Sequence, residues 1–159
     1  MRYKWFYEYP RAGIGFVEDN GVITNIFFGG DSGFNQIPSA ETPLIKQASE
    51  QLTEYFAGER KYFDFPIQPA GSVFQKKVWE AVSAIPYGET RSYKEIAVQA
   101  GNGLAARAVG MANNRNPLVI VIPCHRVVGH NGALTGYGGG LELKAYLLDL
   151  EKAAGRLGS

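Results

Sequence analysis

The chain has 159 residues, a formal net charge of +1 and a single cysteine. Its length suits one medium domain or two small ones, and its 45% apolar and 19% charged residues are typical of a folded globular protein rather than a disordered chain. One cysteine excludes an intramolecular disulfide, and the lack of a Cys-x-x-Cys pair or a histidine cluster argues against a zinc site.

The first part of the chain predicts a small antiparallel sheet. Lys4–Tyr9 is rich in aromatic residues, which favour strands. Gly13–Val17 and Val22–Phe28 are β-favouring runs, and Asn20-Gly21 between them is a dipeptide preferred in tight hairpin turns. We therefore expect a hairpin, completed to a sheet by the first strand.

A helix is predicted over Pro43–Phe56, where apolar side chains recur at helical spacing. Thr42 suits the N-cap, Pro43 suits the first helical position, and Gly58 suits the residue that ends a helix. The first part is thus expected to fold as a β-hairpin plus helix domain.

A domain boundary is expected near Ala70. Residues 64–71 contain two prolines and a glycine, a composition typical of a linker. Residues 1–74 carry 6 basic and 9 acidic side chains, whereas residues 75–159 carry 10 basic and 6 acidic ones. We predict domains over residues 1–70 and 71–159, of which the second meets a polyanion.

The second part is predicted to be mainly helical, which gives an α+β fold overall. Apolar residues repeat at helical spacing from Phe74 to Ile85, and Ser92 begins a Ser-x-x-Glu capping box for a helix over residues 93–100. A turn at Gly101-Asn102-Gly103 leads to a second helix over residues 104–113, rich in small residues and bearing Arg107. This is the outline of a DNA-binding helix-turn-helix or of an ordinary helical hairpin.

The end of the chain is expected to contain a buried strand, a loop and a helix. Leu118–Ile122 is a short apolar run that Pro123 ends, and it is far too short to span a membrane. A glycine-rich loop follows over residues 129–140, and residues 141–150 form an amphipathic helix with Leu141, Ala145 and Leu148 facing inward. No signal-peptide pattern opens the chain, so a cytoplasmic protein is expected.

Cys124 and His125 are the residues most able to carry chemistry. A lone cysteine is often buried and inert, but a neighbouring base can turn a thiol into a nucleophile. Adjacent residues on a strand face opposite sides, so the chain must turn at Pro123 for His125 to serve Cys124. A third group must hold the imidazole, and an acid on the last helix is a candidate. Residue types alone leave an alkyl or acyl transferase, a cysteine hydrolase and an inert thiol open.

The sequence around Cys124 and His125 resembles that of a known family, the O6-alkylguanine–DNA alkyltransferases. The resemblance spans nearly all of residues 71–151 in order and at family spacing, whereas residues 1–70 resemble the family in length and coarse pattern. The matching stretches are Phe74-Gln75 with Val78-Trp79, then Ile85 to Tyr93 (IPYGETRSY), Ala106 to Gly110 (ARAVG), Asn116 to Val128 (NPLVIVIPCHRVV) and Tyr137 to Leu141 (YGGGL).

The resemblance implies a role for five residues in the chemistry. Cys124 is the alkyl acceptor, His125 deprotonates it through a water, and Glu151 orients the histidine. Asn116 shapes the pocket beside the cysteine, and Tyr137 donates a hydrogen bond to the guanine as it leaves. The resulting thioether has no easy leaving group, so each molecule is expected to act once.

The resemblance also implies how DNA is held. Arg107 fills the place of a flipped nucleotide, Tyr93 presses on its phosphate, and Asn102 contacts the backbone. Arg126 is either a DNA contact or a structural residue. The implied partner is duplex DNA carrying O6-alkylguanine, with O4-alkylthymine as a second candidate substrate, and the implied state is a monomer in solution.

Three alternatives accompany the alkyltransferase interpretation. A damage-sensing protein of the alkyltransferase-like type lacks the acceptor cysteine, which this chain has at Cys124. A helix-turn-helix regulator reads bases through polar side chains, of which the second helix has few. A hydrolase has no need for Arg107. The zinc ligands of some family members are missing, so neither a metal nor a cofactor is expected.

Overall fold

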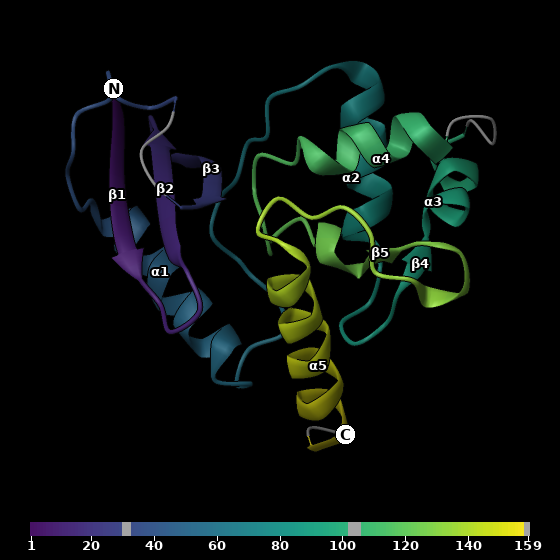
Figure 1. The fold of residues 1–159 in the computed structure, drawn as a ribbon. Helices are drawn as coiled ribbons and strands as arrows, with labels where there is room; N and C mark the ends of the chain where they lie inside the picture. Colours follow the sequence, from purple (N-terminus) through teal and green to yellow (C-terminus); the bar gives the residue numbers. More distant parts are fainter. Residues whose placement is uncertain (30–32, 102–105, 158–159) are drawn as a thin grey trace. The chain divides into compact units, whose positions relative to one another are not determined.

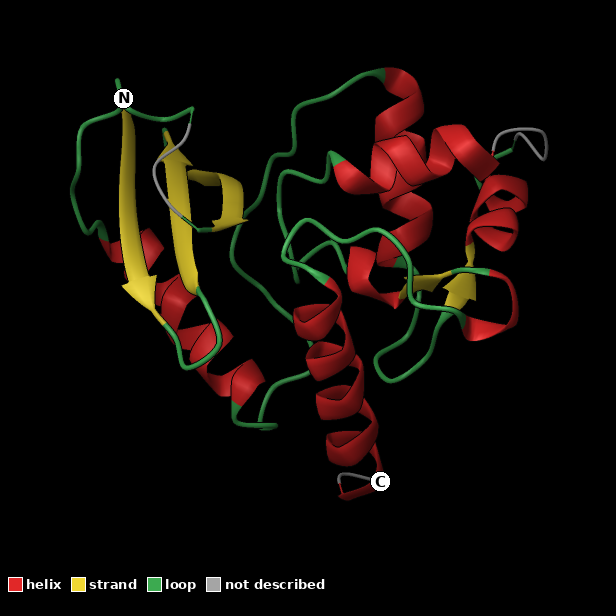
Figure 2. Ribbon diagram, viewed as in Figure 1, coloured by secondary structure: helices red, strands yellow, loops and turns green. Residues whose placement is uncertain are grey.

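The computed structural model describes residues 1–29, 33–101 and 106–157, and the chain divides into two compact units. The first unit comprises residues 1–70 together with 117–119, and the second comprises residues 71–116 and those from 120 onward. A three-stranded antiparallel sheet characterises the first unit, and helices dominate the second (Figures 1 and 2). The α+β fold predicted from the sequence is confirmed. None of the described helices combines the length and apolar character needed to cross a membrane.

The sheet of the first unit has the strand order β1-β2-β3. Its strands are β1 (Arg2–Glu8), β2 (Gly13–Asp19) and β3 (Val22–Phe28). The predicted hairpin is confirmed, because Asn20 and Gly21 connect β2 to β3 with positive φ angles of 50° and 90°. The inner positions are fully buried, including Ile14, Phe16 and Ile26.

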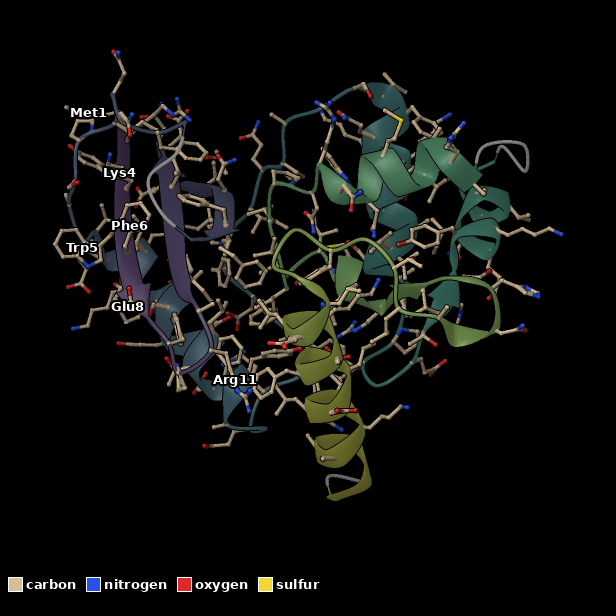
Figure 3. All side chains as sticks on the ribbon, in the orientation of Figure 1. Met1, Lys4, Trp5, Phe6, Glu8 and Arg11 are labelled. Atoms are coloured by element: carbon tan, nitrogen blue, oxygen red, sulfur yellow. The ribbon has the colours of Figure 1, made fainter. Side chains whose placement is uncertain are left out.

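The strand β1 lies at an edge of this sheet, and a passing segment protects its outer side. Lys4 donates its backbone N–H to Pro38 O at 3.0 Å and accepts from Ala40 N at 3.0 Å. Its side chain is also buried, with Nζ donating to Phe34 O at 2.9 Å. Figure 3 labels Lys4 and its neighbour Trp5 on this strand, and Trp5 is 37% exposed. The edge is therefore covered by backbone pairing rather than left open.

The helix α1 (Pro43–Phe56) covers the sheet and has the predicted ends. The side chain of Thr42 accepts from Ile45 N at 3.1 Å, and Pro43 occupies the first helical position. Gly58 follows the helix with φ of 76°, a left-handed conformation that glycine adopts without a Cβ penalty. The inward face of α1 includes Ile45 and Leu52.

The second unit contains the helix pair predicted as a helix-turn-helix. Its elements in chain order are α2 (Val73–Ser83), β4 (Arg91–Ser92), α3 (Tyr93–Gln99), α4 (Ala106–Asn114), η1 (Cys124–Arg126), β5 (Val127–Val128), η2 (His130–Gly132) and α5 (Leu141–Leu157). Ser92 and Glu95 form the expected capping box at the start of α3. Ser72 and Gln75 form a second one at α2, which the sequence analysis did not predict. The α3 and α4 helices pack against each other and against α2.

In the segment Leu118–Ile122 the predicted burial holds for Leu118, Ile120 and Ile122, whereas Val119 and Val121 are half-buried, and the segment is not a continuous strand. Pro117 and Val119 exchange hydrogen bonds with Ile26 of β3 at 2.8 and 3.1 Å. The chain then turns at Ile120, whose φ of 72° is unusual for a β-branched residue. An apolar run indicates burial but carries no information about a change of direction within it.

The helix α5 extends seven residues beyond the predicted end at Leu150, and its inward face differs from the prediction. Leu141 is 48% exposed, and Ala145 and Leu148 are half-buried. The buried positions belong to Leu143, Lys144, Leu147 and Glu151. The predicted face was wrong because apolar residues alone defined it, whereas two charged side chains occupy inward positions.

The N-cap of α1 provides a test of the first unit. We expect Thr42→Ala to lower the free energy of unfolding by about 1 kcal/mol, because the N–H of Ile45 loses its acceptor. Gln47→Ala is the matched control, since Gln47 is exposed within the same helix and alanine has the higher helix propensity. Urea unfolding followed by circular dichroism measures both. Equal losses in the two variants contradict the assignment of Thr42 as a stabilising cap.

Candidate active site

Cys124 lies at the start of a tight turn that Pro123 initiates. Pro123 has φ of −80° and ψ of 64°, and the N–H of Cys124 donates to Ile122 O at 2.7 Å across it. Residues 124–126 then form one turn of 3₁₀ helix, closed by Arg126 N donating to Pro123 O at 2.9 Å. The side chain of Cys124 is 4% exposed. Cys124 and His125 therefore lie in one helical turn and not on a regular strand, where their side chains would point to opposite faces.

Groups on both sides hold this turn in place. Asn116 donates from Nδ2 to Ile122 O at 2.7 Å, and Asn113 on α4 donates from Nδ2 to Cys124 O at 3.2 Å. After the turn, β5 pairs in parallel with β4, with Val127 opposite Arg91. The nucleophile is therefore attached to the end of α4 and, through β4, to the start of α3.

A buried carboxylate organises the next two residues. His125 Nε2 lies 2.7 Å from Glu151 Oε2. Arg126 donates from Nε to Glu151 Oε1 at 2.8 Å and from its terminal nitrogens to Glu151 Oε2 at 3.0 Å and Ile85 O at 2.8 Å. The N–H of Gly88 donates to Glu151 Oε1 at 3.2 Å. His125 and Glu151 are fully buried, and Arg126 nearly so.

These contacts fix the protonation of the pair. Burial by itself raises the pKa of Glu151, but the hydrogen bonds and charges of His125 and Arg126 outweigh it and bring this pKa to about 2. Burial lowers the pKa of His125 below its ordinary value, against the opposing effect of Glu151. The imidazole is thus neutral near pH 7. The ionised Glu151 can only accept a hydrogen bond from Nε2 of His125. We therefore assign the ring proton to Nε2, which leaves Nδ1 as the basic nitrogen.

Cys124 itself is a thiol in the resting protein. Burial raises the pKa of Cys124 to about 11, although a hydrogen bond with Asn116 and the charge of Lys144 act in the opposite direction. A thiolate is the reactive form, so this cysteine needs a base when it reacts. The neighbouring neutral imidazole is a suitable one.

Lys144 on α5 is a fully buried cation that holds the glycine-rich loop. Its Nζ donates to Val127 O at 2.6 Å and to Thr135 O at 2.7 Å. Tyr93 on α3 joins this group, donating from its hydroxyl to Thr135 O at 3.3 Å and accepting from Thr135 Oγ1 at 3.2 Å. The loop is therefore tied to α3, β5 and α5.

The structure brings five of the predicted residues into one region of the second unit. Tyr137 has its ring centroid 6.5 Å from that of His125, and the two rings are nearly perpendicular. Burial, followed by the electrostatic effects of Cys124 and Glu151, raises the pKa of Tyr137 well above 10, so its hydroxyl keeps its proton. Asn116 completes the group through Ile122 O.

Two of the residues predicted to contact DNA, Arg107 and Tyr93, lie on α4 and α3. Arg107 is exposed on α4 and has no side-chain partner among the described residues. Tyr93 is half-buried and bonded to Thr135, and its ring lies close to Gly110 of α4. Asn102 lies outside the described residues.

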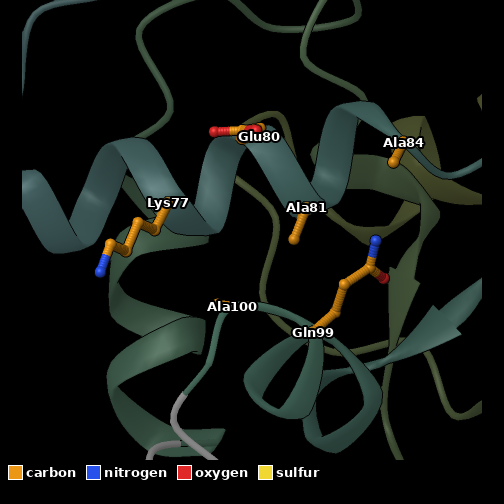
Figure 4. Close-up of a pocket in the computed structure, with 6 residues that line it drawn as sticks. All are labelled: Lys77, Glu80, Ala81, Ala84, Gln99 and Ala100. Carbon is orange, nitrogen blue, oxygen red and sulfur yellow. The ribbon is translucent and has the colours of Figure 1, made fainter.

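Two cavities of the second unit are lined by residues other than Cys124. One of about 330 Å³ lies between α2 and α3 (Figure 4), and its lining residues are Lys77, Glu80, Ala81, Ala84, Gln99 and Ala100. Another of about 320 Å³ lies between the glycine-rich loop and α5, with Leu134 and Leu148 in its wall. Across the described ranges, no three His, Cys, Asp or Glu side chains gather in a way that could hold a metal ion.

Three residues of this site were missed or left undecided by the sequence analysis. Arg126 was left between a DNA contact and a structural role, and it is a structural partner of Glu151. Lys144 and Asn113 were not singled out, because polar residues on a helix are usually exposed. The signal for Lys144 was the phase of the helix, since Lys144 and Glu151 are seven residues apart and share one face.

Two family models match the chain. The ribonuclease-like domain of 6-O-methylguanine DNA methyltransferase matches residues 6–69, and the DNA binding domain of 6-O-methylguanine DNA methyltransferase matches residues 73–153. This chain belongs to the 6-O-methylguanine DNA methyltransferase family. The resemblance seen in the sequence is confirmed, and the match extends to the first unit.

Three relatives match between 68% and 96% of the chain. A constitutive methylated-DNA–protein-cysteine methyltransferase of Bacillus subtilis is 45% identical over 159 aligned positions that cover 96% of each chain. Its counterpart from Methanosarcina acetivorans is 60% identical over 108 residues, 68% of this chain and 69% of the relative. The crystal structure of Mycobacterium tuberculosis OGT in complex with DNA matches with a TM-score of 0.90 at 43% identity, covering 96% of this chain and 94% of that one.

The buried pair predicts how stability depends on pH. The pKa of Glu151 is lower in the folded chain than its ordinary 4.5, so its contribution is present above about pH 4.5 and is lost as pH falls toward 2. The lowered pKa of His125 adds a loss that begins near pH 6.5. We expect the free energy of unfolding, measured by urea titration, to fall steadily from pH 7 to pH 3.

Glu151→Gln separates this effect from general acid unfolding. The variant leaves Arg126 buried without its carboxylate, and we expect a loss of about 3–5 kcal/mol at pH 7 together with a flatter pH dependence below pH 4.5. Glu142→Gln, an exposed change on the same helix, is the control and should leave both quantities near the wild-type values. Identical pH profiles for wild type and Glu151→Gln rule out the assigned role.

Proposed function

We propose that this protein repairs DNA by transferring an alkyl group from O6-alkylguanine irreversibly to its own Cys124. The observation that carries the proposal is the buried arrangement of Cys124, His125 and Glu151 on one turn and the facing helix. Family membership supports the reaction class, since the relatives of Bacillus subtilis and Methanosarcina acetivorans are methylated-DNA–protein-cysteine methyltransferases. The partner is DNA.

Activation of the thiol follows from the charges around it. The proton of Cys124 moves through a water to Nδ1 of His125, and the imidazolium that forms is stabilised by Glu151 at Nε2. Arg126 and Gly88 hold the carboxylate in position, so it keeps its orientation while the histidine changes charge. A thiol with a pKa of about 11 gains most of its nucleophilicity from this transfer.

The transfer itself is a displacement at the alkyl carbon. The thiolate sulfur of Cys124 forms a bond to that carbon as the bond from carbon to O6 of the guanine breaks. The electron pair of the broken bond remains with the purine, which takes up one proton, so that overall the proton lost by the Cys124 thiol is balanced by the one that the guanine gains. Tyr137 is suited to stabilise this leaving group, because its raised pKa keeps a hydroxyl proton available for a hydrogen bond.

Access to the base requires that it leave the duplex. Extruding a nucleotide costs a few kcal/mol, and an inserted side chain offsets part of this cost. Arg107 has the position for that task, because it is exposed on α4 and is flanked by Ala106 and Ala108, whose small side chains permit close approach to a groove. Tyr93 and Asn102 stay predicted contacts to the nucleic-acid backbone.

Two features favour transfer over damage sensing. The chain has the acceptor cysteine, and the described site gives it a base and an orienting acid. The product is a thioether, which neither the described residues nor the single cysteine of the chain can resolve, so one molecule repairs one base. We further propose that the protein acts as a monomer in the cytoplasm and accepts O6-alkylguanine in preference to undamaged guanine.

Intact-protein mass after incubation with a duplex containing O6-methylguanine tests the reaction. We expect the wild type to gain the mass of one methylene group, saturating at one per chain, and Cys124→Ser to gain none. Turnover beyond one equivalent argues for a hydrolase. Binding of the damaged duplex without a gain of mass argues for damage sensing.

Arg107→Ala tests the extrusion step. We expect the transfer rate from a fully paired duplex to fall at least about tenfold, because the vacated stack is not filled, whereas transfer from the single strand of the same sequence changes much less. Lys152→Ala removes one exposed positive charge from α5 and serves as the control. Mass spectrometry of samples quenched at successive times gives both transfer rates. An equal fall in rate on the duplex and on the single strand indicates a role in general DNA affinity instead.

A further inference from the structure

The last turn of α4 connects the helix that bears Arg107 to the residue that bears the nucleophile. Asn113 lies on this turn and is 3% exposed. Its Nδ2 donates to the backbone carbonyl of Cys124 at 3.2 Å. Arg107 lies six residues earlier on the same helix, about 9 Å along its axis. A single rigid element therefore links the group expected to enter DNA with the backbone of the acceptor.

Neighbouring contacts make this link stiff. Trp79 Nε1 of α2 donates to Ala112 O at 2.9 Å and fixes the end of α4. Asn116 holds Ile122 O at 2.7 Å, so the carbonyls on both sides of Pro123 are held by amide groups. The turn has little freedom to move relative to α4 while both bonds persist.

Stability alone does not account for Asn113. Its Oδ1 is buried and accepts no hydrogen bond from the residues that the structure describes. A buried acceptor without a partner costs about as much free energy as one neutral hydrogen bond contributes, so the bond to Cys124 brings little net stabilisation.

We propose that Asn113 is a positioning residue, which sets the backbone of Cys124 relative to α4 so that a base extruded from the duplex on this helix meets the sulfur in line. The inference rests on the proposed function and extends it to a residue outside the Cys124, His125 and Glu151 relay. Displacement at carbon is sensitive to alignment, and a misplacement of about 1 Å can cost about 100-fold in rate.

Asn113→Leu and Asn113→Ala test this role. Three quantities are measured for each variant and for wild type: the Kd for a duplex containing O6-methylguanine, the limiting first-order rate of methyl transfer from saturating duplex, and the rate of Cys124 modification by iodoacetamide without DNA. We expect the limiting rate to fall about 10- to 100-fold, while Kd and the iodoacetamide rate stay within about threefold of wild type.

The iodoacetamide rate separates positioning from damage to the thiol. Iodoacetamide reaches the sulfur without being held by α4, so its rate reports the acidity and access of Cys124 alone. Gln99→Leu removes an exposed amide from α3 and is the control, with all three quantities expected to stay at wild-type values.

Several outcomes overturn the proposal. An unchanged limiting rate shows that Asn113 has no part in alignment. A parallel fall in the methyl-transfer and iodoacetamide rates, or failure of both variants to fold, shows that Asn113 is structural. If wild type is not methylated at all, the proposed function fails with it, whereas normal methylation of wild type and both variants refutes this inference alone.

Discussion

The carboxylate of Glu151 is the group on which the chemistry of the second unit depends. Burying a charge is costly unless hydrogen bonds and opposite charges compensate for it, and here two side chains and the N–H of Gly88 do so. In return the ion fixes the tautomer of His125. The ion also pairs with Arg126 and so allows this side chain to be buried. The three consecutive buried residues Cys124, His125 and Arg126 then serve as proposed nucleophile, proposed base and partner of the carboxylate.

The second constraint is mechanical. The nucleophile sits on a short turn that accepts a hydrogen bond from Asn116 before Pro123 and one from Asn113 of α4 after it, and β5 pairs in parallel with the segment that precedes α3. Lys144 fixes the exit of the same turn through Val127 O. The helices predicted to meet DNA and the group predicted to react with it therefore belong to one framework, which needs no large rearrangement to keep its geometry.

Local rules predicted the parts of the fold that depend on neighbouring residues. Asn20-Gly21, Thr42 and the Ser92 capping box each act over a few positions, and the structure has them where they were expected. The site was different. Residue types identified Cys124 and His125, but Glu151 came from the resemblance, because no spacing rule connects positions 26 residues apart.

The sequence did not predict the burial of polar groups whose partners are distant along the chain, nor a turn within an apolar run. Lys144 faces inward because two backbone carbonyls receive its ammonium group, and neither carbonyl can be identified from composition or periodicity. The turn at Ile120 is equally invisible, since five consecutive apolar residues resemble an ordinary buried strand. In both cases tertiary contacts override the local preference.

The close packing of Cys124 has a consequence for the protein after it has reacted. The side chain is 4% exposed, and the product carries an added carbon in a place that the folded chain already fills. Extra volume in a packed interior usually costs about 1–3 kcal/mol, out of a total stability of about 5–15 kcal/mol for a typical domain. At equilibrium the unfolded fraction would then be roughly 5 to 150 times larger for a spent molecule than for a fresh one, so used and unused copies differ in stability.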